Sequence, residues 1–362
     1  MASNRQTPNM SVIADALGVS AATVSNALSG KGRVSPELIE RVRAKAEELG
    51  YVPSVTARAL RTGRSGVIGL VLPNISNPLF PQIAQAIENA AADAGYGVLI
   101  ADSSGDNAKQ TLAIQRLIER QVDGIVIVPR LGTRIAELAC PVAVIDSPST
   151  PNNTVSADHW QGGQLVAEHL VDLGHRDFVL IGANPLSNVQ NDRIGGMKSR
   201  IPKDGRVDVI WIERNEMVLG AGCPLGLKEK VENGFTAFAA SSDLHALRAL
   251  TELQRAGIRV PNEASVVGFD DLVWSSVVSP SITTVRQDAV AIADIAIGAL
   301  LATIEREPSP EASNIAVAQC NRVPMALVPR QTTARLATAD ASASDNSSFA
   351  NSSSSPPERN AP

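Results

Sequence analysis

The sequence predicts an all-α head of three short helices, followed by an α/β body made of two doubly wound parallel-sheet subdomains. In about the first fifty residues, apolar side chains recur at helical spacing, and glycines separate the segments. From residue 65 onward, short apolar runs alternate with helical patterns in two successive series. Such alternation is typical of parallel sheets covered by helices on both faces. A chain of 362 residues, 44% hydrophobic and 19% charged, is long enough for these domains.

Three helices are expected in the head. An apolar stripe at positions i, i+3, i+4 and i+7 predicts the first helix from Met10 to Leu17, and Gly18 ends it because glycine readily takes a positive φ. Ser20 is a favourable N-cap for the second helix. The third helix is expected to begin at Ser35, with proline and glutamate in its first turn, and to end at Gly50.

The outward face of the second helix carries small and polar side chains. A purely structural helix usually carries Glu and Lys pairs there, whereas short side chains let the backbone approach base edges. Asn26 can pair with adenine, and the methyl groups of Ala21 and Ala22 can meet a thymine methyl. We therefore interpret the first two helices as a helix-turn-helix that enters the DNA major groove. A three-helix packing module that binds no DNA is the alternative.

The charge of the chain is unevenly distributed. Residues 1–64 carry nine Lys and Arg against five Asp and Glu, whereas the remaining residues carry 23 against 32. Cations that displace condensed counterions supply the sequence-independent part of nucleic-acid affinity. The basic head on an acidic body therefore favours a polyanion such as nucleic acid as the partner of the head, with a merely solvated basic surface as the alternative.

Several motifs follow one another in order across the head. They are Val19-Ser20-Ala21-Ala22-Thr23-Val24-Ser25-Asn26-Ala27-Leu28, Val34-Ser35, Glu48-Leu49-Gly50-Tyr51-Val52-Pro53-Ser54 and Ala57-Arg58-Ala59-Leu60-Arg61-Thr62-Gly63. In this order they resemble the DNA-binding head of the LacI/GalR family of transcriptional repressors. Several family members carry an arginine where Asn26 stands, so the operator sequence of a relative does not transfer to this chain.

The resemblance implies a division of the chain and a set of DNA contacts. Residues 1–52 would form the helix-turn-helix domain and residues 53–64 a hinge helix that orders on DNA. Leu60 would be wedged into a minor-groove step with Arg61 beside it, although Leu60 can also be an ordinary linker residue. The residues expected to contact DNA are Ser20, Ala21, Ala22, Thr23, Ser25, Asn26, Arg33, Leu60 and Arg61.

The body is expected to contain two series of strands and helices. In the first series the expected strands are 67–72, 98–101, 124–128 and 142–145, and the expected helices are 79–94, 107–120 and a short one near 133. In the second series the expected strands are 178–181, 207–212, 235–239 and 266–269, and the expected helices begin at Gln190, lie near 226 and span 246–256.

Polar side chains follow the strands of both series. In doubly wound folds, ligands bind outside the carboxyl ends of the strands, so these side chains are expected to line one crevice suited to a small, hydroxyl-rich ligand. The alternative is that each Asp or Asn merely caps a helix or forms a turn. The side chains are Asn74, Ser76, Asn77, Asp102, Ser103, Asp146, Ser147, Asn191, Asp192, Arg193, Asp243, Asp270 and Asp271.

The resemblance continues through the body, over nearly all of residues 10–332. It implies a body that resembles periplasmic sugar-binding proteins, dimerises and binds an effector between its subdomains, here over residues 65–334. Arg193 is the favoured contact because its planar guanidinium suits paired oxygens, with a structural salt bridge as the alternative. The effector-contacting residues expected are Asn77, Phe80, Asp146, Arg193, Asp243, Asp270 and Trp274.

The region 196–233 departs from the family pattern. Gly195, Gly196 and Pro202 are expected to cut short the helix after Arg193, and Met217 to Gly226 is glycine-rich.

Beyond the body, residues 335–362 consist largely of Ala, Ser, Thr, Asn and Pro and are expected to form a disordered tail.

No catalytic, cofactor or metal motif is found in the sequence. It contains no P-loop or GxSxG, its four histidines lack metal-ligand spacing, and Cys140, Cys223 and Cys320 form no CxxC pair. We therefore expect no enzyme activity, no cofactor and no metal. The sequence also contains no secretory signal and no run of about 18 apolar residues, so we expect a cytoplasmic protein without a membrane span.

These observations predict a homodimeric repressor of transcription. A two-fold dimer would read a near-palindromic operator, and a sugar or nucleoside effector bound between the subdomains would control that affinity. Two other classes of protein remain possible for the body alone. A solute-binding protein for transport would need export, and an α/β sugar-processing enzyme would need a carboxylate pair or cofactor loop that the sequence lacks.

Overall fold

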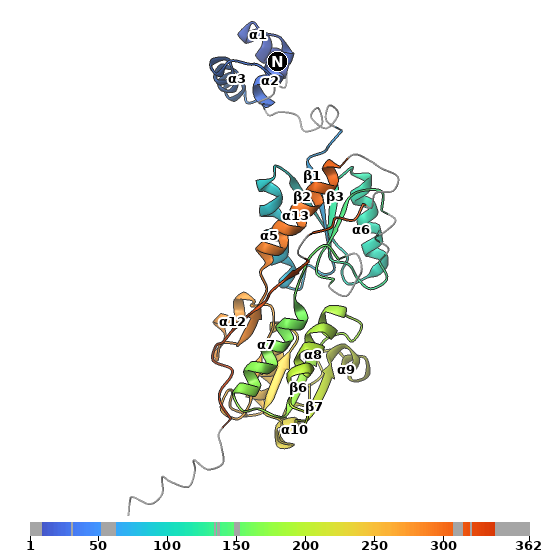
Figure 1. The fold of residues 1–362 in the computed structure, drawn as a ribbon, viewed down its shortest axis with the longest axis vertical. Helices are drawn as coiled ribbons and strands as arrows, with labels where there is room; N and C mark the ends of the chain where they lie inside the picture. The colour runs from blue at the N-terminus through green and yellow to red at the C-terminus, as the bar shows by residue number, and fades with distance from the viewer. Residues whose placement is uncertain are drawn as a thin grey trace, which may run out of the picture. The chain divides into compact units, whose positions relative to one another are not determined.

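The computed structural model describes residues 9–29, 32–51, 63–133, 135, 138–147, 153–306, 314–318 and 321–336. The chain divides into two compact units, Met1–Gly66 and Val67–Pro362, and each is described by itself (Figure 1). The predicted hinge contacts Leu60 and Arg61 lie outside the described residues, as do residues 337–362 of the predicted tail.

Three helices surround a small apolar core in the first unit. Ile13, Val24 and Val42, one from each helix, are fully buried at its centre. Gly18 has a φ of 67° and ends the first helix as the sequence predicts. The helices are α1 (Met10–Leu17), α2 (Ala21–Ser29) and α3 (Pro36–Glu48).

The first subdomain of the second unit is a parallel sheet with the strand order β2-β1-β3-β4. The strands β1 and β3 are buried along nearly their whole length because helices cover both faces. The strands are β1 (Val67–Leu72), β2 (Gly97–Asp102), β3 (Gly124–Ile127) and β4 (Val142–Val144), and the helices that follow β1 and β2 are α5 (Leu79–Asp93) and α6 (Asn107–Glu119).

The second subdomain repeats this design with the strand order β7-β6-β8-β9, again parallel throughout. Its strands are β6 (Phe178–Gly182), β7 (Val207–Trp211), β8 (Ala237–Ala240) and β9 (Ser265–Val267). Its helices are α7 (His159–Asp172), α8 (Asn188–Arg200), α9 (Ile212–Leu219), α10 (Leu227–Glu232) and α11 (Asp243–Arg255).

The chain crosses between the subdomains more than once. After α12 (Val273–Val277), it returns to the first subdomain, where α13 (Ala289–Glu305) packs on α5, β3 and β4 (Figure 1). Two small strand pairs accompany the crossings. They are β5 (Ser156–Ala157) with β11 (Arg322–Val323), and β10 (Thr284–Arg286) with β12 (Ala326–Val328). The predicted fold class, with two doubly wound sheets, is confirmed.

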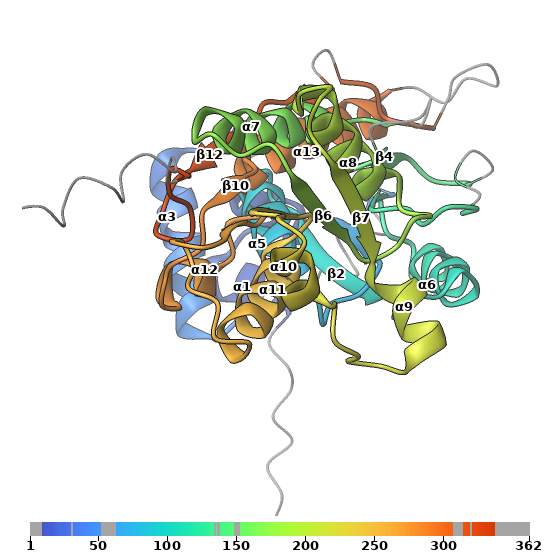
Figure 2. The same ribbon diagram turned by 90° about the horizontal axis from the view of Figure 1, so that it is seen from below.

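The prediction that glycines cut short the helix after Arg193 is wrong. The helix α8 continues through Gly195 and Gly196 to Arg200 and lies beside α7 (Figure 2). A Cβ atom built on Gly196 would lie 2.1 Å from the carbonyl oxygen of Trp160 in α7. Glycine at this position therefore allows two helix backbones to touch, which outweighs its low helix propensity.

Two further helix predictions differ from the structure. The described residues near position 133 form a turn and irregular chain, not a helix, and residues 134, 136 and 137 lie outside the described set. The helix α9 was not predicted. Among the described residues, no single helix is long and apolar enough to cross a membrane. The pair α1 and α2 passes that test only together, across a bend of 105°.

Candidate functional site

The outward face of α2 consists of small side chains held on a well-capped helix. The Ser20 hydroxyl accepts a hydrogen bond from the Thr23 N–H (3.1 Å) and lies 2.9 Å from the Thr23 hydroxyl. Both hydroxyls therefore stabilise the start of the helix. Ala21 and Ala22 are exposed beside them. This face can approach a surface closely because no long side chain stands in front of its backbone.

The other predicted DNA contacts in the head lie further along the chain. Asn26 is exposed, and its amide lies next to Gly32, where a Cβ atom would be 3.2 Å from the Asn26 nitrogen. The φ of Gly32 is 86°, so the turn after α2 both needs glycine and leaves room for Asn26. Ser25 is half-buried, and Arg33 is exposed.

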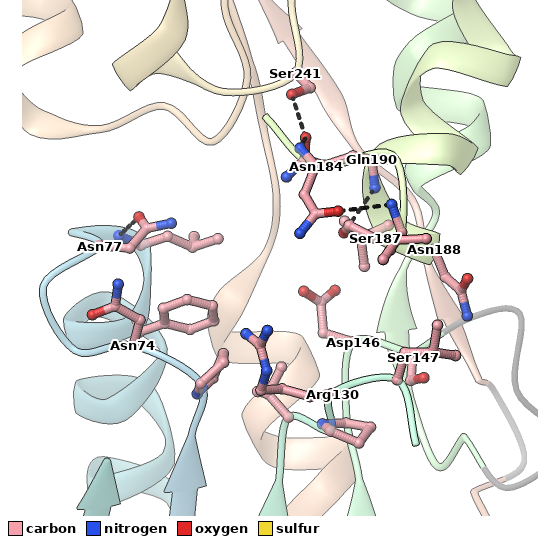
Figure 3. Close-up of a pocket in the computed structure, with 18 of the residues that line it drawn as sticks. Asn74, Asn77, Arg130, Asp146, Ser147, Asn184, Ser187, Asn188, Gln190 and Ser241 are labelled. Atoms are coloured by element: carbon pink, nitrogen blue, oxygen red, sulfur yellow. Dashed lines mark hydrogen bonds between the residues drawn. The ribbon is translucent and has the colours of Figure 1, made fainter. Parts of the chain in front are cut away.

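A pocket of about 760 Å³ lies in the second unit, where the carboxyl ends of both sheets meet. Residues of both subdomains surround it, and most are polar (Figure 3). Phe80, at the start of α5, supplies an aromatic wall. The polar and charged lining residues are Asn74, Asn77, Asn107, Arg130, Thr133, Asp146, Ser147, Asn184, Ser187, Asn188, Gln190, Arg193, Glu213, Ser241, Ser242, His245 and Asp270.

Four buried charged or titratable side chains form a continuous row at the pocket. The Nε2 atom of His159 lies 2.5 Å from Oδ1 of Asp146, and its Nδ1 atom accepts a hydrogen bond from Nε of Arg193 (3.2 Å). Nη1 of Arg193 forms an ion pair with Asp270 (2.8 Å) and donates to the carbonyl of Ser241 (2.6 Å). All four side chains of the row are at least nine-tenths buried.

Arg193 keeps one donor group unused. Its Nη2 atom is buried and has no hydrogen-bond partner among the described residues. The guanidinium carbon stands 4.1 Å from the centre of the Phe269 ring, which supports the planar group from one side. Arg193 also lines the pocket, so this unpartnered N–H donor belongs to a residue of the pocket wall.

The two carboxylates of the row have opposite pKa shifts. Burial raises the pKa of Asp146, but His159 and Arg193 more than offset this, so the net shift is downward. For Asp270, burial dominates and raises the pKa, despite the opposing effect of Arg193. Asp146 therefore favours the ionised form, which only accepts hydrogen bonds.

Five of the seven predicted effector contacts line the pocket: Asn77, Phe80, Asp146, Arg193 and Asp270. The other two, Asp243 and Trp274, do not line this pocket.

The carboxylate of Asp243 is fully buried and holds the second subdomain together. It accepts hydrogen bonds from the Leu272 N–H (2.7 Å), the Ser275 hydroxyl (2.6 Å) and the Thr284 hydroxyl (2.6 Å). Trp274 packs against the main apolar core.

Sequence reasoning missed several groups at the site. His159 lies behind the pocket wall, and Arg130, Gln190, Ser241 and His245 line the pocket. Gln190 is itself a predicted helix start, which is a weak signal, and Arg130 lies just beyond the end of a predicted strand. No sequence signal indicates His159. No group of three or more potential metal ligands is found within the part of the chain that the structure describes.

The pKa shifts of Asp243 and His245 predict opposite dependences of the free energy of unfolding on pH. Burial raises the pKa of Asp243 to about 7, whereas burial, with Arg248 and Arg193, lowers the pKa of His245 to about 4. The folded state therefore binds the Asp243 proton more tightly than the unfolded chain does, and this contribution to stability falls as pH rises from 3.8 to about 7. The His245 contribution rises from about pH 4 to 6.5.

Single substitutions of Asp243 and His245 should remove one pH-dependent contribution to stability at a time. The free energy of unfolding of Asp243→Asn should rise more steeply with pH than that of the wild type, and that of His245→Gln should rise less steeply. Urea unfolding at a series of pH values measures both. Parallel curves for all three proteins would contradict these pKa shifts.

Comparison with known proteins gives matches to both units. A family model described as bacterial regulatory proteins, lacI family, matches residues 9–54, and a model described as a periplasmic binding protein-like domain matches residues 167–333. The HTH-type transcriptional regulator DegA of Bacillus subtilis is 32% identical over 286 residues, which cover 76% of this chain and 85% of the relative.

Two solved structures are similar in fold over most of their length. One is a periplasmic binding protein/LacI transcriptional regulator from Alkaliphilus metalliredigens complexed with D-xylulofuranose, with 25% identity and a TM-score of 0.64 over 74% of this chain and 99% of its own. The other is the Lac repressor dimer bound to operator and the anti-inducer ONPF, with 27% identity and a TM-score of 0.72 over 91% of this chain and 100% of its own.

Proposed function

This chain belongs to the LacI/GalR family of transcriptional regulators, and we propose that its effector is a sugar bound by Asp146 and Arg193 in the pocket of the second unit. The protein is a DNA-binding repressor whose operator affinity a small molecule controls, and it acts as a dimer. It is not an enzyme. The alternative, a solute-binding protein for transport, does not account for the helix-turn-helix head.

One observation carries the proposal for the effector. Arg193 presents a buried N–H group without a partner among the described residues, beside a carboxylate with a lowered pKa, in a pocket lined by amides and hydroxyls. Adjacent hydroxyl groups of a sugar offer both the acceptor for Arg193 and the donor for Asp146. The sugar in the related structure from Alkaliphilus metalliredigens supports the same class of ligand.

A ligand panel tests the effector class. The purified protein is screened by thermal shift with D-xylulose, D-ribose, D-glucose, D-galactose and adenosine, and each hit is titrated against a protein–operator complex. A sugar that raises the melting temperature and changes operator affinity supports the proposal. Stabilisation by adenosine alone would replace it with a nucleoside effector.

The DNA contacts proposed for the head are the exposed residues of α2 and its turn, foremost Ala21, Ala22 and Asn26. An operator is first identified by retardation of genomic fragments. We expect Asn26→Ala to weaken operator binding about 10- to 100-fold, because an asparagine–adenine pair contributes about 1–3 kcal/mol of discrimination. Binding to an unrelated duplex should change little, because that affinity comes from phosphate contacts.

Glu47→Gln serves as the control for Asn26→Ala, since Glu47 is exposed on α3 and is not among the predicted DNA contacts. Fluorescence anisotropy at fixed salt concentration measures the affinities of the wild type and both variants for the operator and for the unrelated duplex. An equal loss for operator and unrelated DNA in Asn26→Ala would argue against base recognition by this residue.

The remaining assignments of the chain are also proposals. We assign residues 53–64, with Leu60 and Arg61, to a DNA-ordered hinge. The Leu336 N–H donates to the Leu173 carbonyl (2.9 Å), so the predicted tail does not begin at residue 335. A regulator of transcription must reach the chromosome, which supports a cytoplasmic location for a bacterial-type repressor.

A further inference from the structure

His159 lies between the two side chains that we assign to the effector, yet it does not line the pocket itself. It is the first residue of α7 in the second subdomain. Asp146 belongs to the first subdomain, just beyond β4, and has a left-handed backbone with a φ of 55°. Arg193 comes from α8 in the second subdomain. His159 therefore connects an effector contact of one subdomain to an effector contact of the other.

The hydrogen bonds of His159 determine which ring nitrogen carries the proton. The Nε atom of an arginine always donates, so Nδ1 of His159, at 3.2 Å from it, must be the acceptor. The proton of the imidazole then belongs on Nε2, where it is donated to Asp146. Arg193 thus fixes the tautomer that allows His159 to hold the Asp146 carboxylate.

We propose that His159 is a positioning residue that aligns Asp146 and Arg193 with each other across the two subdomains, so that both engage one effector molecule. The proposal rests on the proposed function, because it takes this pocket as the effector site. The imidazole leaves the second oxygen of Asp146 and Nη2 of Arg193 for the effector, since it occupies only Oδ1 and Nε. The His159 side chain has an exposed fraction of 0%, so bulk water does not compete for its two hydrogen bonds.

Two substitutions separate hydrogen bonding from space filling. His159→Phe keeps a ring but removes the hydrogen bonds to Oδ1 of Asp146 and Nε of Arg193, and we expect it to weaken sugar binding about 10- to 100-fold. His159→Gln offers an amide N–H for Asp146 and an amide oxygen for Arg193, and should restore binding to within a few-fold of the wild type. Isothermal titration with the sugar that scores highest in the panel measures both.

His175→Phe is the matched control. His175 is also buried and hydrogen-bonded through both ring nitrogens, to Thr236 and Ser265, but it does not line the pocket or contact its lining residues. We expect this variant to lose stability and keep its sugar affinity. Equal losses of affinity in the two phenylalanine variants would overturn the positioning role, and so would wild-type affinity in His159→Phe.

A double-mutant cycle tests whether His159 acts through Asp146. In an Asp146→Asn background the carboxylate that His159 holds is already gone and only the bond to Nε of Arg193 remains to be lost, so His159→Phe should reduce sugar affinity by a smaller factor than in the wild type. A purely structural residue would give the same loss in both backgrounds. Additive losses would therefore contradict the proposal even if each single variant weakens binding.

Nitrogen NMR of histidine-labelled protein tests the inference without any sugar. The four histidines can be assigned by single substitutions. We expect the ligand-free protein to show His159 protonated at Nε2 and bare at Nδ1. Protonation at Nδ1 overturns the proposal, because His159 then cannot donate to Asp146 and accept from Arg193. If no sugar binds, the effector class of the proposed function fails, and this measurement still decides the role of His159.

Discussion

Replacing Arg193 with glutamine is expected to weaken sugar binding about 100-fold and to leave operator binding of the sugar-free protein nearly unchanged. The guanidinium supplies the buried Nη2 donor of the pocket, and hydrogen bonds to charged groups contribute about 1.5–3 kcal/mol. The operator affinity of this variant should therefore stay unchanged at sugar concentrations that change the operator affinity of the wild type. Titration calorimetry and anisotropy on the identified operator measure the two affinities.

The same substitution should also lower the free energy of unfolding by about 3 kcal/mol, because it leaves Asp270 as an unpaired buried carboxylate. Arg200→Gln is the matched control on the same helix. Arg200 pairs with Glu168 at 2.9 Å, but both side chains are about half exposed, so its loss should have little effect on either quantity. If Arg193→Gln keeps the sugar affinity of the wild type, Arg193 is only a structural partner of Asp270.

The polar pocket could be predicted from the sequence because parallel strands bring their carboxyl ends to one edge. Asp146 and Asp270 each come shortly after a strand, and both reach the pocket. Asp243 follows β8 in the same way, but its carboxylate turns toward Ser275 and Thr284 instead. A residue's place after a strand fixes its backbone position and leaves its side-chain direction open.

For Arg193, the structural interpretation is confirmed and the functional one stays a prediction. The guanidinium forms the salt bridge to Asp270, and its Nη2 atom has no partner among the described residues. His159 was not predicted because its two partners lie 13 and 34 residues away along the chain. Contacts at such separations depend on how α7 and α8 pack, and the periodicity of either helix alone does not reveal that.

Glycine in α8 shows the limit of local propensity most directly. From the sequence, Gly195 and Gly196 indicate a helix end, since glycine destabilises a helix interior by about 1 kcal/mol relative to alanine. The structure shows that α7 and α8 meet backbone to backbone. A Cβ atom on Gly163 would lie 2.1 Å from the Arg193 oxygen, as one on Gly196 would from the Trp160 oxygen. A glycine required by a neighbouring helix looks the same in the sequence as one that ends a helix.

We therefore expect Gly196→Ala to lower the free energy of unfolding by about 3 kcal/mol, at the upper end of overpacking effects, because the added methyl group meets a backbone atom that no side-chain rotation can move away. The two helices must separate to accept it. Since α7 carries His159 and α8 carries Arg193, this separation should also weaken sugar binding, whereas the three-helix head should still bind DNA. Urea unfolding and calorimetry measure the first two effects.

Gly298→Ala is the control that isolates the contact between helices. Gly298 lies inside α13, and a Cβ atom there would meet nothing within 4 Å. This substitution should stabilise the protein by about 0.5–1 kcal/mol, because alanine has the higher helix propensity and no clash opposes it. Stabilisation by both substitutions would mean that α7 and α8 do not touch at Gly196, and the close contact that positions His159 beside Arg193 would then be absent.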